Sequence, residues 1–466
     1  MISSLAVNYC LSAKVGCLVL GMLVLALLTN CSSMSEETED EPKPNIILVL
    51  TDDLDATSIP LSRMANIKRY MVDQGTTFEN AFVTNPLCCP SRVTILRGQY
   101  SHNHGVLTNG PPDGGFKKFN SLGREKSTVA TWLQNGGYRT VLIGRYLNDT
   151  PRGQKPPGWN EVHGGGYKAA DVHHTDWFAD KASSFIRSTK GKRKPFFIYL
   201  ATKSPHRPAI PAARHADAFP GVKAPRPPSF NEQDVSDKPG WISDKRSLSA
   251  RGIDEIDKLY RKRLQSMLAI DEMIEQLVGS LSYSGKLENT YIVFSSDHGF
   301  SQGEHRRKWG KGAAYEESIR VPLIVRGPSV PQGKTREHMV LNNDLAPTIA
   351  QLGGVNTPSF VDGRSLEPLL RSYPPPPSNW RSRFLVEGYD SGERSVVSPY
   401  KAVRTEDHLW VEYTNGEREL YDLSTDPYQL QSLHDTASRS LRQTLSSELD
   451  ELRSCARERC RDAEGF

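Results

Sequence analysis

Five short stretches of the sequence carry residue types that could do chemistry together. "TDD" (51–53) and "SDH" (296–298) are acidic, "CCPSR" (88–92) holds two cysteines and an arginine, "KSPHRP" (203–208) holds a histidine, and "GKG" (310–312) a lysine. Carboxylate oxygens with imidazole suit a divalent cation. A guanidinium and an ammonium group suit a tetrahedral oxyanion. The stretches together predict a metal-held site for a sulfate or phosphate ester.

Each of the two acidic stretches directly follows an apolar run of strand length. Asp52 and Asp53 follow the apolar run "NIILVLT", and Asp297 and His298 follow "YIVFSS". In open α/β sheets, ligands sit beyond the carboxyl ends of the strands. For either pair alone a helix cap or a turn is an equally good interpretation, since Asp is enriched in both. His206 alone would likewise more often be structural or exposed.

The adjacent Cys88 and Cys89 would make a strained disulfide with each other, and no further Cys or His stands at the offsets of a zinc site. The remaining cysteines lie near the two ends of the chain: Cys10, Cys17, Cys31, Cys455 and Cys460. A bridge between the last two would need a break in the helix predicted for "SRSLRQTLSSELDELRSCARE", so the sequence leaves that bridge open.

The N-terminus predicts export. Residues 15–28 form an apolar stretch of signal-peptide length after Lys14, too short to span a membrane. "LTNC" (28–31) resembles a bacterial lipobox, although Asn30 departs from the usual small residue. We predict a signal peptide over 1–30, Cys31 as a candidate lipid attachment site and a disordered tether over 31–44. The expected location is periplasmic, cell-surface lipid-anchored or secreted, with an uncleaved anchor as the alternative.

The net charge of the chain is too small to indicate a nucleic-acid partner. The chain has 466 residues and a formal net charge of +4, and its short basic runs are typical of solvated loops. We expect no nucleic-acid partner, and contact with a membrane only through the lipid anchor.

Elements that would position these groups alternate between apolar strands and amphipathic helices. The clearest helix covers 260–281, and alternation of this kind predicts an α/β fold with a mostly parallel or mixed sheet between helices. We expect a catalytic domain over 45–378 with a long rim loop at 205–245. A smaller subdomain over 379–466 is expected to contain an antiparallel sheet and a helix. Predicted sheet strands lie at 45–53, 138–145, 195–201, 289–299 and 321–328.

Residues 88–98 match C-x-P-S-R-x-x-x-L-x-G, the signature of the type I, formylglycine-dependent sulfatases, at every defined position. Further stretches resemble that family in order from residue 45 to about 435, including "LVLTDDLD", "GYRTVLIGRYLN", "SPHRP", "FSSDHG" and "KGAAYEESIRVPLIVRGP". The chain most resembles the branch of glucosamine-6-sulfatases and microbial arylsulfatases. The resemblance implies an alkaline phosphatase-like fold.

The resemblance implies that a formylglycine-generating enzyme oxidises Cys88 to formylglycine (3-oxoalanine), with Cys89 at a variable position. The hydrated aldehyde has two hydroxyls, one to attack sulfur and one to expel sulfate afterwards. The implied metal is Ca2+, with Mg2+ as the alternative. Its implied ligands are residue 88 with Asp52, Asp53, Asp297 and His298.

The same resemblance assigns Arg92 to orienting and stabilising the diol, and His206 to protonating the leaving alcohol. It assigns Lys311 either to binding the sulfate oxygens or to helping the leaving group. Arg145 stands where the family has lysine and keeps a cation for sulfate. The histidine that often follows two residues later, and that usually serves as the base for sulfate elimination, is absent. Asn148, or His104 of "SHNHG", is a candidate to take part of that role.

The predicted function is hydrolysis of a sulfate monoester of a sugar or an aryl alcohol. One rival is a phosphonate monoester or phosphodiester hydrolase of the same superfamily. Another is a surface glycan-binding protein without catalysis, which would follow if Cys88 is not converted.

Overall fold

The computed structural model describes residues 42–164, 173–390 and 397–465. The predictions for the signal peptide, for Cys31 and for the tether up to residue 41 therefore lie outside the described residues. Within the described ranges, no helix combines the length and apolar character needed to cross a membrane.

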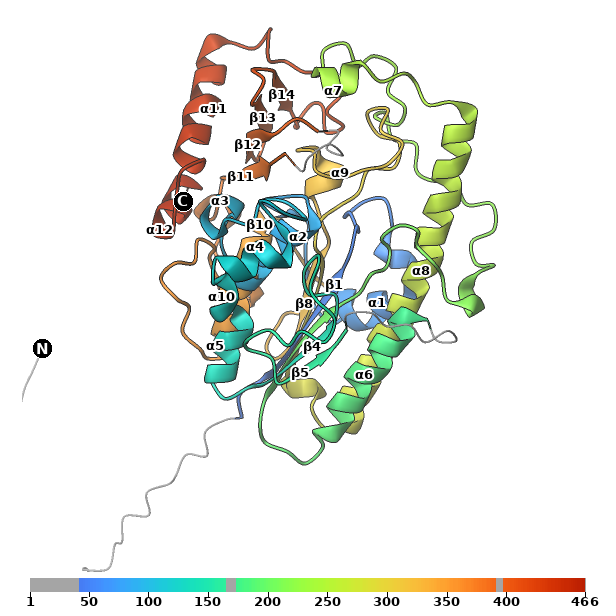
Figure 1. The fold of residues 1–466 in the computed structure, drawn as a ribbon, viewed down its shortest axis with the longest axis vertical. Helices are drawn as coiled ribbons and strands as arrows, with labels where there is room; N and C mark the ends of the chain where they lie inside the picture. The colour runs from blue at the N-terminus through green and yellow to red at the C-terminus, as the bar shows by residue number, and fades with distance from the viewer. Residues whose placement is uncertain (1–41, 165–172, 391–396, 466) are drawn as a thin grey trace, which may run out of the picture. The chain divides into compact units, whose positions relative to one another are not determined.

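An eight-stranded mixed sheet forms the centre of the fold (Figure 1). Its central strands β1 and β7 are parallel, as are β1 and β6, whereas β8 runs antiparallel to both β7 and β2. The prediction of a mostly parallel or mixed sheet is confirmed. In spatial order the strands are β5 (Glu161–His163), β4 (Arg139–Gly144), β6 (Phe196–Ala201), β1 (Asn45–Thr51), β7 (Thr290–Ser296), β8 (Leu323–Arg326), β2 (Thr76–Phe78) and β9 (Lys334–Arg336).

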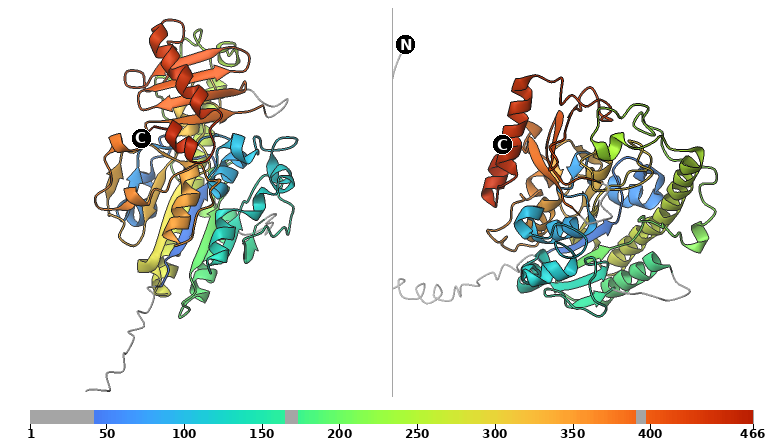
Figure 2. Two further views of the ribbon diagram at one scale, coloured as in Figure 1. Left: turned by 90° about the vertical axis from the view of Figure 1, so that its left-hand side faces the viewer. Right: turned by 45° about the horizontal axis from the view of Figure 1, so that its top comes forward.

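Helices cover both faces of this sheet (Figures 1 and 2). Successive side chains of β1 point to opposite faces. Ile47 and Val49 pack in the core with α6 (His174–Ser188) and α8 (Ala250–Tyr283). Their neighbours Ile46 and Leu48 pack in the core with α2 (Cys88–Arg97), α5 (Val129–Asn135) and α10 (Leu345–Leu352). Burial on both faces explains the unbroken apolar runs in the strands.

The predicted helix over 260–281 lies within α8, which begins at Ala250 because the Ser249 hydroxyl accepts the Gly252 N–H as a cap. The rim at 205–245 is mostly irregular, as predicted, with only η4 (Ala213–His215) and α7 (Gly240–Ser243). The remaining short elements before residue 380 are η1 (Leu61–Arg63), α1 (Ala65–Ile67), η2 (Lys68–Val72), β3 (Ala81–Phe82), α3 (Ser101–His104), α4 (Gly115–Ser121), η3 (Arg124–Lys126), η5 (Leu287–Asn289), α9 (Glu316–Ile319), β10 (Val340–Leu341), η6 (Asn342–Asp344), η7 (Glu367–Leu370) and η8 (Pro377–Asn379).

The C-terminal part is an antiparallel sheet with a helix across it (Figure 2), as predicted. The helix α11 buries Leu445, Leu449 and Leu452, a stripe at helical spacing. The strands are β11 (Arg383–Gly388), β12 (Tyr400–Thr405), β13 (His408–Tyr413) and β14 (Arg418–Asp422), followed by α11 (Arg439–Leu452) and α12 (Glu458–Ala463).

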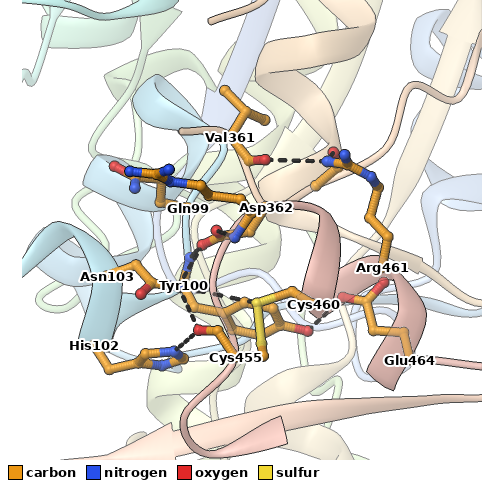
Figure 3. Close-up of a disulfide and its surroundings, with 12 residues drawn as sticks. Gln99, Tyr100, His102, Asn103, Val361, Asp362, Cys455, Cys460, Arg461 and Glu464 are labelled. Carbon is orange, nitrogen blue, oxygen red and sulfur yellow. Dashed lines mark hydrogen bonds between the residues drawn. A yellow bond between two sulfur atoms is a disulfide. The ribbon is translucent and has the colours of Figure 1, made fainter. Parts of the chain in front are cut away.

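The bridge that the sequence left open is present, since Cys455 and Cys460 form a disulfide (Figure 3). The required break lies between α11 and α12, where Arg457 takes a φ of 63°. The Cys455 carbonyl accepts hydrogen bonds from His102 Nε2 at 2.8 Å and Asn103 Nδ2 at 3.0 Å. The bridged turn therefore binds directly to α3, the short helix after α2.

Candidate active site

The two acidic pairs meet because β1 and β7 are neighbours in register, with Thr51 opposite Ser296. The Asp297 N–H donates to the Thr51 carbonyl at 3.1 Å, and the Asp53 N–H donates to Asp297 Oδ1 at 3.3 Å. Asp53 itself has a left-handed φ of 69°, which Asp tolerates better than most residues. Three buried carboxylates thus converge at one edge of the sheet.

Cys88 is the first residue of α2 and lies against these groups. Its Sγ is 3.9 Å from Asp52 Oδ1, 3.2 Å from His298 Nε2 and 3.0 Å from Lys311 Nζ. Pro90 fits the first turn of α2, where its missing N–H costs no helical hydrogen bond. Residue 88 therefore stands at the positive end of a buried helix, a place that favours a bound anion.

Cys89 has a different environment from its neighbour. It is fully buried, it packs in the core on the α2 side of the sheet, and its N–H donates to Asn109 Oδ1 at 2.8 Å. Burial raises the pKa of the Cys89 thiol to about 12. Both cysteines are free, so the adjacent pair consists of one thiol in the polar cluster and one inert core thiol.

All three nitrogens of the Arg92 guanidinium contact neighbouring oxygens. Its Nε is 2.9 Å from Asp297 Oδ2, its Nη2 is 3.1 Å from Asp52 Oδ2, and its Nη1 donates to the Arg145 carbonyl at 3.1 Å. Burial raises the pKa of the Asp52 carboxyl, but the charges of Arg92 and Arg145 outweigh this effect and hold it below its usual value. Arg92 therefore holds the carboxylates of Asp52 and Asp297 in place.

Arg145 reaches the same carboxylate from β4, with Nη1 2.8 Å from Asp52 Oδ2. The preceding Gly144 has a φ of 92°, and a Cβ there would lie 1.9 Å from the Ala201 carbonyl oxygen. Only glycine fits this close approach. The side chain of Arg145 remains 29% exposed, so its outer nitrogens can face a ligand.

Lys311 and His206 stand at the mouth of the site. Lys311 Nζ is 2.6 Å from Asp53 Oδ1, and His206 Nε2 is 3.8 Å from Asp53 Oδ2. Burial lowers the pKa of Lys311, but the charge of Asp53 outweighs it and raises this pKa. We call the nine residues gathered here the residue-88 cluster: Asp52, Asp53, Cys88, Arg92, Arg145, His206, Asp297, His298 and Lys311.

The two remaining candidate residues, Asn148 and His104, have different surroundings. Asn148 lines a cavity beside Arg145, and its buried Oδ1 has no hydrogen-bond partner among the described residues. His104 is fully buried, with Nε2 3.1 Å from Thr94 Oγ1 and Nδ1 accepting the Val106 N–H. Burial lowers the pKa of His104 to about 3. The structure therefore brings Asn148 to the site and holds His104 in the protein interior, where both ring nitrogens are engaged, and the role suggested for either residue stays a prediction.

The cluster suits a divalent cation by its donor chemistry. Two overlapping sets hold ligand atoms within 4.8 Å of one another: Asp52, Cys88, Asp297 and His298, and Asp52, Asp53 and His206. The His298 Nδ1–H donates to the Gly299 carbonyl at 2.9 Å, which leaves Nε2 directed at the set, as is usual for a metal-binding histidine. Burial lowers the pKa of His298, but Asp297 outweighs it and raises this pKa to about 9.

A cavity of about 760 Å³ opens beside Arg145 and His206. It lies beyond the carboxyl ends of β4 and β6, where the first turn of α6 forms another wall. Its walls include Leu147, Phe178 and Ala209, and polar groups of Asn148, His174 and Lys203. Its size lies within the range of ligand pockets.

The sequence did not point to Lys203 or His174. Lys203 stands three residues before His206 in "KSPHRP", where only the histidine suggested a catalytic role. His174 opens α6 and has no motif. Its Nε2 lies 3.5 Å from Ser204 Oγ, a contact that only the fold reveals.

The chain belongs to the sulfatase family. Residues 44–355 match the family model described as Sulfatase, and residues 303–455 match the model described as N-sulphoglucosamine sulphohydrolase, C-terminal. The fold and the family define a sulfuric ester hydrolase. The predictions of family, fold class and sulfate monoester hydrolysis are confirmed.

Similar proteins include an arylsulfatase of Volvox carteri, 32% identical over 90% of this chain and 76% of the relative. An N-acetylglucosamine-6-sulfatase of Capra hircus is 31% identical over 94% of this chain and 88% of the relative. A solved structure of a protein in complex with its substrate D-glucosamine-2-N,6-O-disulfate is 26% identical, with a TM-score of 0.72 over 91% of this chain and 100% of that chain.

Proposed function

We propose that this protein hydrolyses the sulfate ester of a 6-sulfated glucosamine derivative, with residue 88 as the nucleophile after its conversion to formylglycine. The observation that carries the proposal is the position of Cys88, at the start of a buried helix and within hydrogen-bonding reach of Lys311 and His298. The names of the Capra hircus relative and of the substrate in the solved complex support the sugar class.

Formylglycine, once hydrated, supplies a hydroxyl that attacks sulfur and a second that expels sulfate. Asp52, Asp53, Asp297 and His298 would hold Ca2+, or Mg2+, and the bound cation would withdraw charge from the sulfate oxygens. Arg92 orients residue 88 through its contacts with two of these carboxylates. Lys311 and Arg145 bind sulfate oxygens, and Arg145 offers two donors where lysine offers a point charge.

His206 is the acid that protonates the leaving alcohol. Its side chain is 28% exposed and lines the cavity next to Asp53, so it faces both the reacting ester and solvent. Asn148 Oδ1, which lacks a partner among the described residues, accepts a hydrogen bond from a hydroxyl or amide of the sugar.

The disulfide between Cys455 and Cys460 supports export, since such bonds persist in oxidising compartments. We propose that the signal peptide directs the chain out of the cytoplasm and that Cys31 carries a lipid. Labelling cells with a radioactive fatty acid tests this point, because Cys31→Ala should lose the label while Cys89→Ala keeps it. Label on neither protein would contradict the lipid anchor.

The enzymatic test compares kcat/KM for N-acetylglucosamine 6-sulfate, 4-nitrophenyl sulfate and a matched phosphodiester, using protein made together with a formylglycine-generating enzyme. We expect the sugar sulfate to be the best substrate. Dialysis against a chelator should abolish turnover and added Ca2+ should restore it. A preference for the phosphodiester would contradict the proposal in favour of the rival hydrolase, and absence of turnover of all three would favour the glycan binder.

A further inference from the structure

The cavity beside the residue-88 cluster has an uneven distribution of charge. Arg145 contacts Asp52, and His206 lies beside Asp53, so each of these basic side chains already has a carboxylate next to it. Lys203 also lines the cavity, is exposed, and makes no hydrogen bond or ion pair with any described side chain. The carboxylate on the cavity wall, that of Asp149, lies toward Gly110 and Gly115. Among the described residues, Lys203 is thus a cation without a paired anion.

Backbone geometry fixes Lys203 relative to His206. The His206 N–H donates to the Lys203 carbonyl at 2.9 Å, so these residues are the first and last of one turn. Ends of a β-turn lie within about 7 Å of each other at Cα. A lysine side chain can cover that distance, and its ammonium can therefore reach the alcohol part of a substrate whose ester oxygen is at His206.

The turn is held firmly to the sheet. The Thr202 N–H donates to the Leu50 carbonyl at 2.9 Å, and the Asp52 N–H donates to the Ser204 carbonyl at 3.3 Å. The turn that carries Lys203 is therefore joined to the end of β1 that carries the metal-site aspartates. A lysine at this position starts from a fixed Cα, which reduces the ordering cost of binding an anion.

The cavity also contains a neutral polar group. His174 lines the cavity, and burial, together with the charges of His173 and Lys203, lowers its pKa to about 4. At neutral pH its imidazole is uncharged and suits a hydroxyl. Leu147 and Phe178 supply apolar walls. Among the described cavity residues, Lys203 is thus the cation free to bind a charged substituent.

Resting on the proposed function, we infer that Lys203 selects substrates that carry a second anionic group, a sulfate or a carboxylate, on the sugar that leaves. The scissile sulfate binds at the residue-88 cluster, and the second anion binds the Lys203 ammonium across the turn from His206. Lys203 is thus a specificity residue that acts on the leaving group and takes no part in the bond-breaking step.

The test compares Lys203→Ala, Lys203→Arg and the control Lys194→Ala, a change at an exposed lysine in the loop before β6. The substrates are N-acetylglucosamine 6-sulfate, N-sulfoglucosamine 6-sulfate and 6-sulfated N-acetylglucosamine linked to glucuronate. We expect Lys203→Ala to lower kcat/KM for a doubly anionic substrate by about tenfold, the size expected for a lost hydrogen bond between charged groups. The singly sulfated sugar should be little affected, and Lys203→Arg should recover most of the loss.

The two doubly anionic substrates distinguish a sulfate from a carboxylate as the recognised group. Calorimetric binding of the same sugars to the Cys88→Ala protein, with and without Lys203→Ala, gives a readout apart from chemistry. Equal losses for singly and doubly anionic sugars, or no loss for any sugar, would overturn the inference. Absence of turnover by the wild type would instead refute the proposed function, while the binding series would still report on Lys203.

Discussion

The residue-88 cluster and the buried cluster around Arg381 both keep charged side chains away from water, but they balance charge differently. Arg381 contacts both oxygens of Asp344, at 2.7 and 2.8 Å, and Glu464 at 2.7 Å. Tyr100 Oη donates to the other oxygen of Glu464 at 2.7 Å. Every charge in this group, which we call the Arg381 cluster, has a direct partner, and none of its charged side chains is exposed.

The residue-88 cluster crowds three carboxylates together and leaves three of its basic side chains partly exposed to solvent. Lys311 is 17% exposed, His206 28% and Arg145 29%. Such a cluster can exchange its internal contacts for a cation and an anion. The Arg381 cluster cannot, and it joins the segments before α10, before β11 and after α12. We therefore expect changes in the first cluster to affect turnover and changes in the second to affect stability.

The largest expected effect comes from Cys88→Ala. Removing the nucleophile should lower kcat by more than about 10⁴-fold, because no other nucleophilic side chain among the described residues takes the position of residue 88. Cys89→Ala, the matched control one residue later, should leave most of the turnover and lower the free energy of unfolding by about 1 kcal/mol. Steady-state kinetics and urea unfolding measure both effects. Equal loss of turnover in the two variants would mean that the pair has been misassigned.

His206→Ala should separate substrates by their leaving groups. We expect kcat for a sugar sulfate to fall by about 10²- to 10⁴-fold, the usual contribution of a general acid. The loss for 4-nitrophenyl sulfate should be much smaller, because nitrophenolate leaves without a proton. His434→Ala, at a half-buried histidine before α11, is the control. The same loss for both esters would contradict the assignment of His206 as the acid.

Arg381→Met should separate stability from turnover. It leaves Asp344 and Glu464 buried without their main partner, which should cost about 3–5 kcal/mol of unfolding free energy. Folded protein should keep the KM of the wild type. Arg371→Ala, which removes an exposed ion pair with Glu367, should leave stability nearly unchanged. A loss of turnover without a loss of stability in Arg381→Met would reverse the comparison between the two clusters.

The smallest expected effect concerns the ion pair between His102 and Glu387, 2.9 Å apart beside the disulfide. Burial lowers the pKa of His102, but Glu387 outweighs it and raises this pKa above 6.5. Burial raises the pKa of Glu387, but His102 and Lys401 outweigh it and hold this pKa below 4.5. The histidine contributes stability below pH 6.5 that is lost as pH rises through its folded pKa, and the glutamate contributes stability above pH 4.5 that is lost as pH falls.

His102→Gln should therefore cost most between pH 4.5 and 6.5, by about 1 kcal/mol. Urea unfolding at a series of pH values measures the difference from the wild type, which should shrink on both sides of that window. A difference that does not vary with pH would show that His102 acts only through its hydrogen bonds.

The strands and their acidic ends could be predicted because they depend on local patterns. "NIILVLTDD" and "YIVFSSDHG" are each a buried strand followed by ligands, and the sheet needs only to place β1 beside β7 for the ligands to meet. The antiparallel direction of β8 was not visible in "VPLIVRGP", because buried strands of either direction are uniformly apolar. The C-terminal strands were easier to recognise because polar residues at their ends and between their apolar positions interrupt the apolar runs.

Residues whose role depends on distant partners could not be predicted. Arg381 meets Asp344 and Glu464 only after the C-terminal segment packs on the start of α10, and nothing in the sequence around Arg381 indicates this. The surroundings of His104 were hidden for the same reason, since "SHNHG" does not reveal that Thr94 and Val106 contact its two ring nitrogens. The role of Lys203 depends on the turn that brings it close to His206.

The most direct test of the central claim is mass spectrometry of the peptide that contains residues 80–100, together with release of inorganic sulfate from N-acetylglucosamine 6-sulfate. Protein made with a formylglycine-generating enzyme should show residue 88 as the aldehyde and residue 89 as unmodified cysteine, and the sulfate released per minute should rise in proportion to the converted fraction. Sulfate release that is independent of conversion, or full conversion with no release from any sulfate ester, would contradict the account.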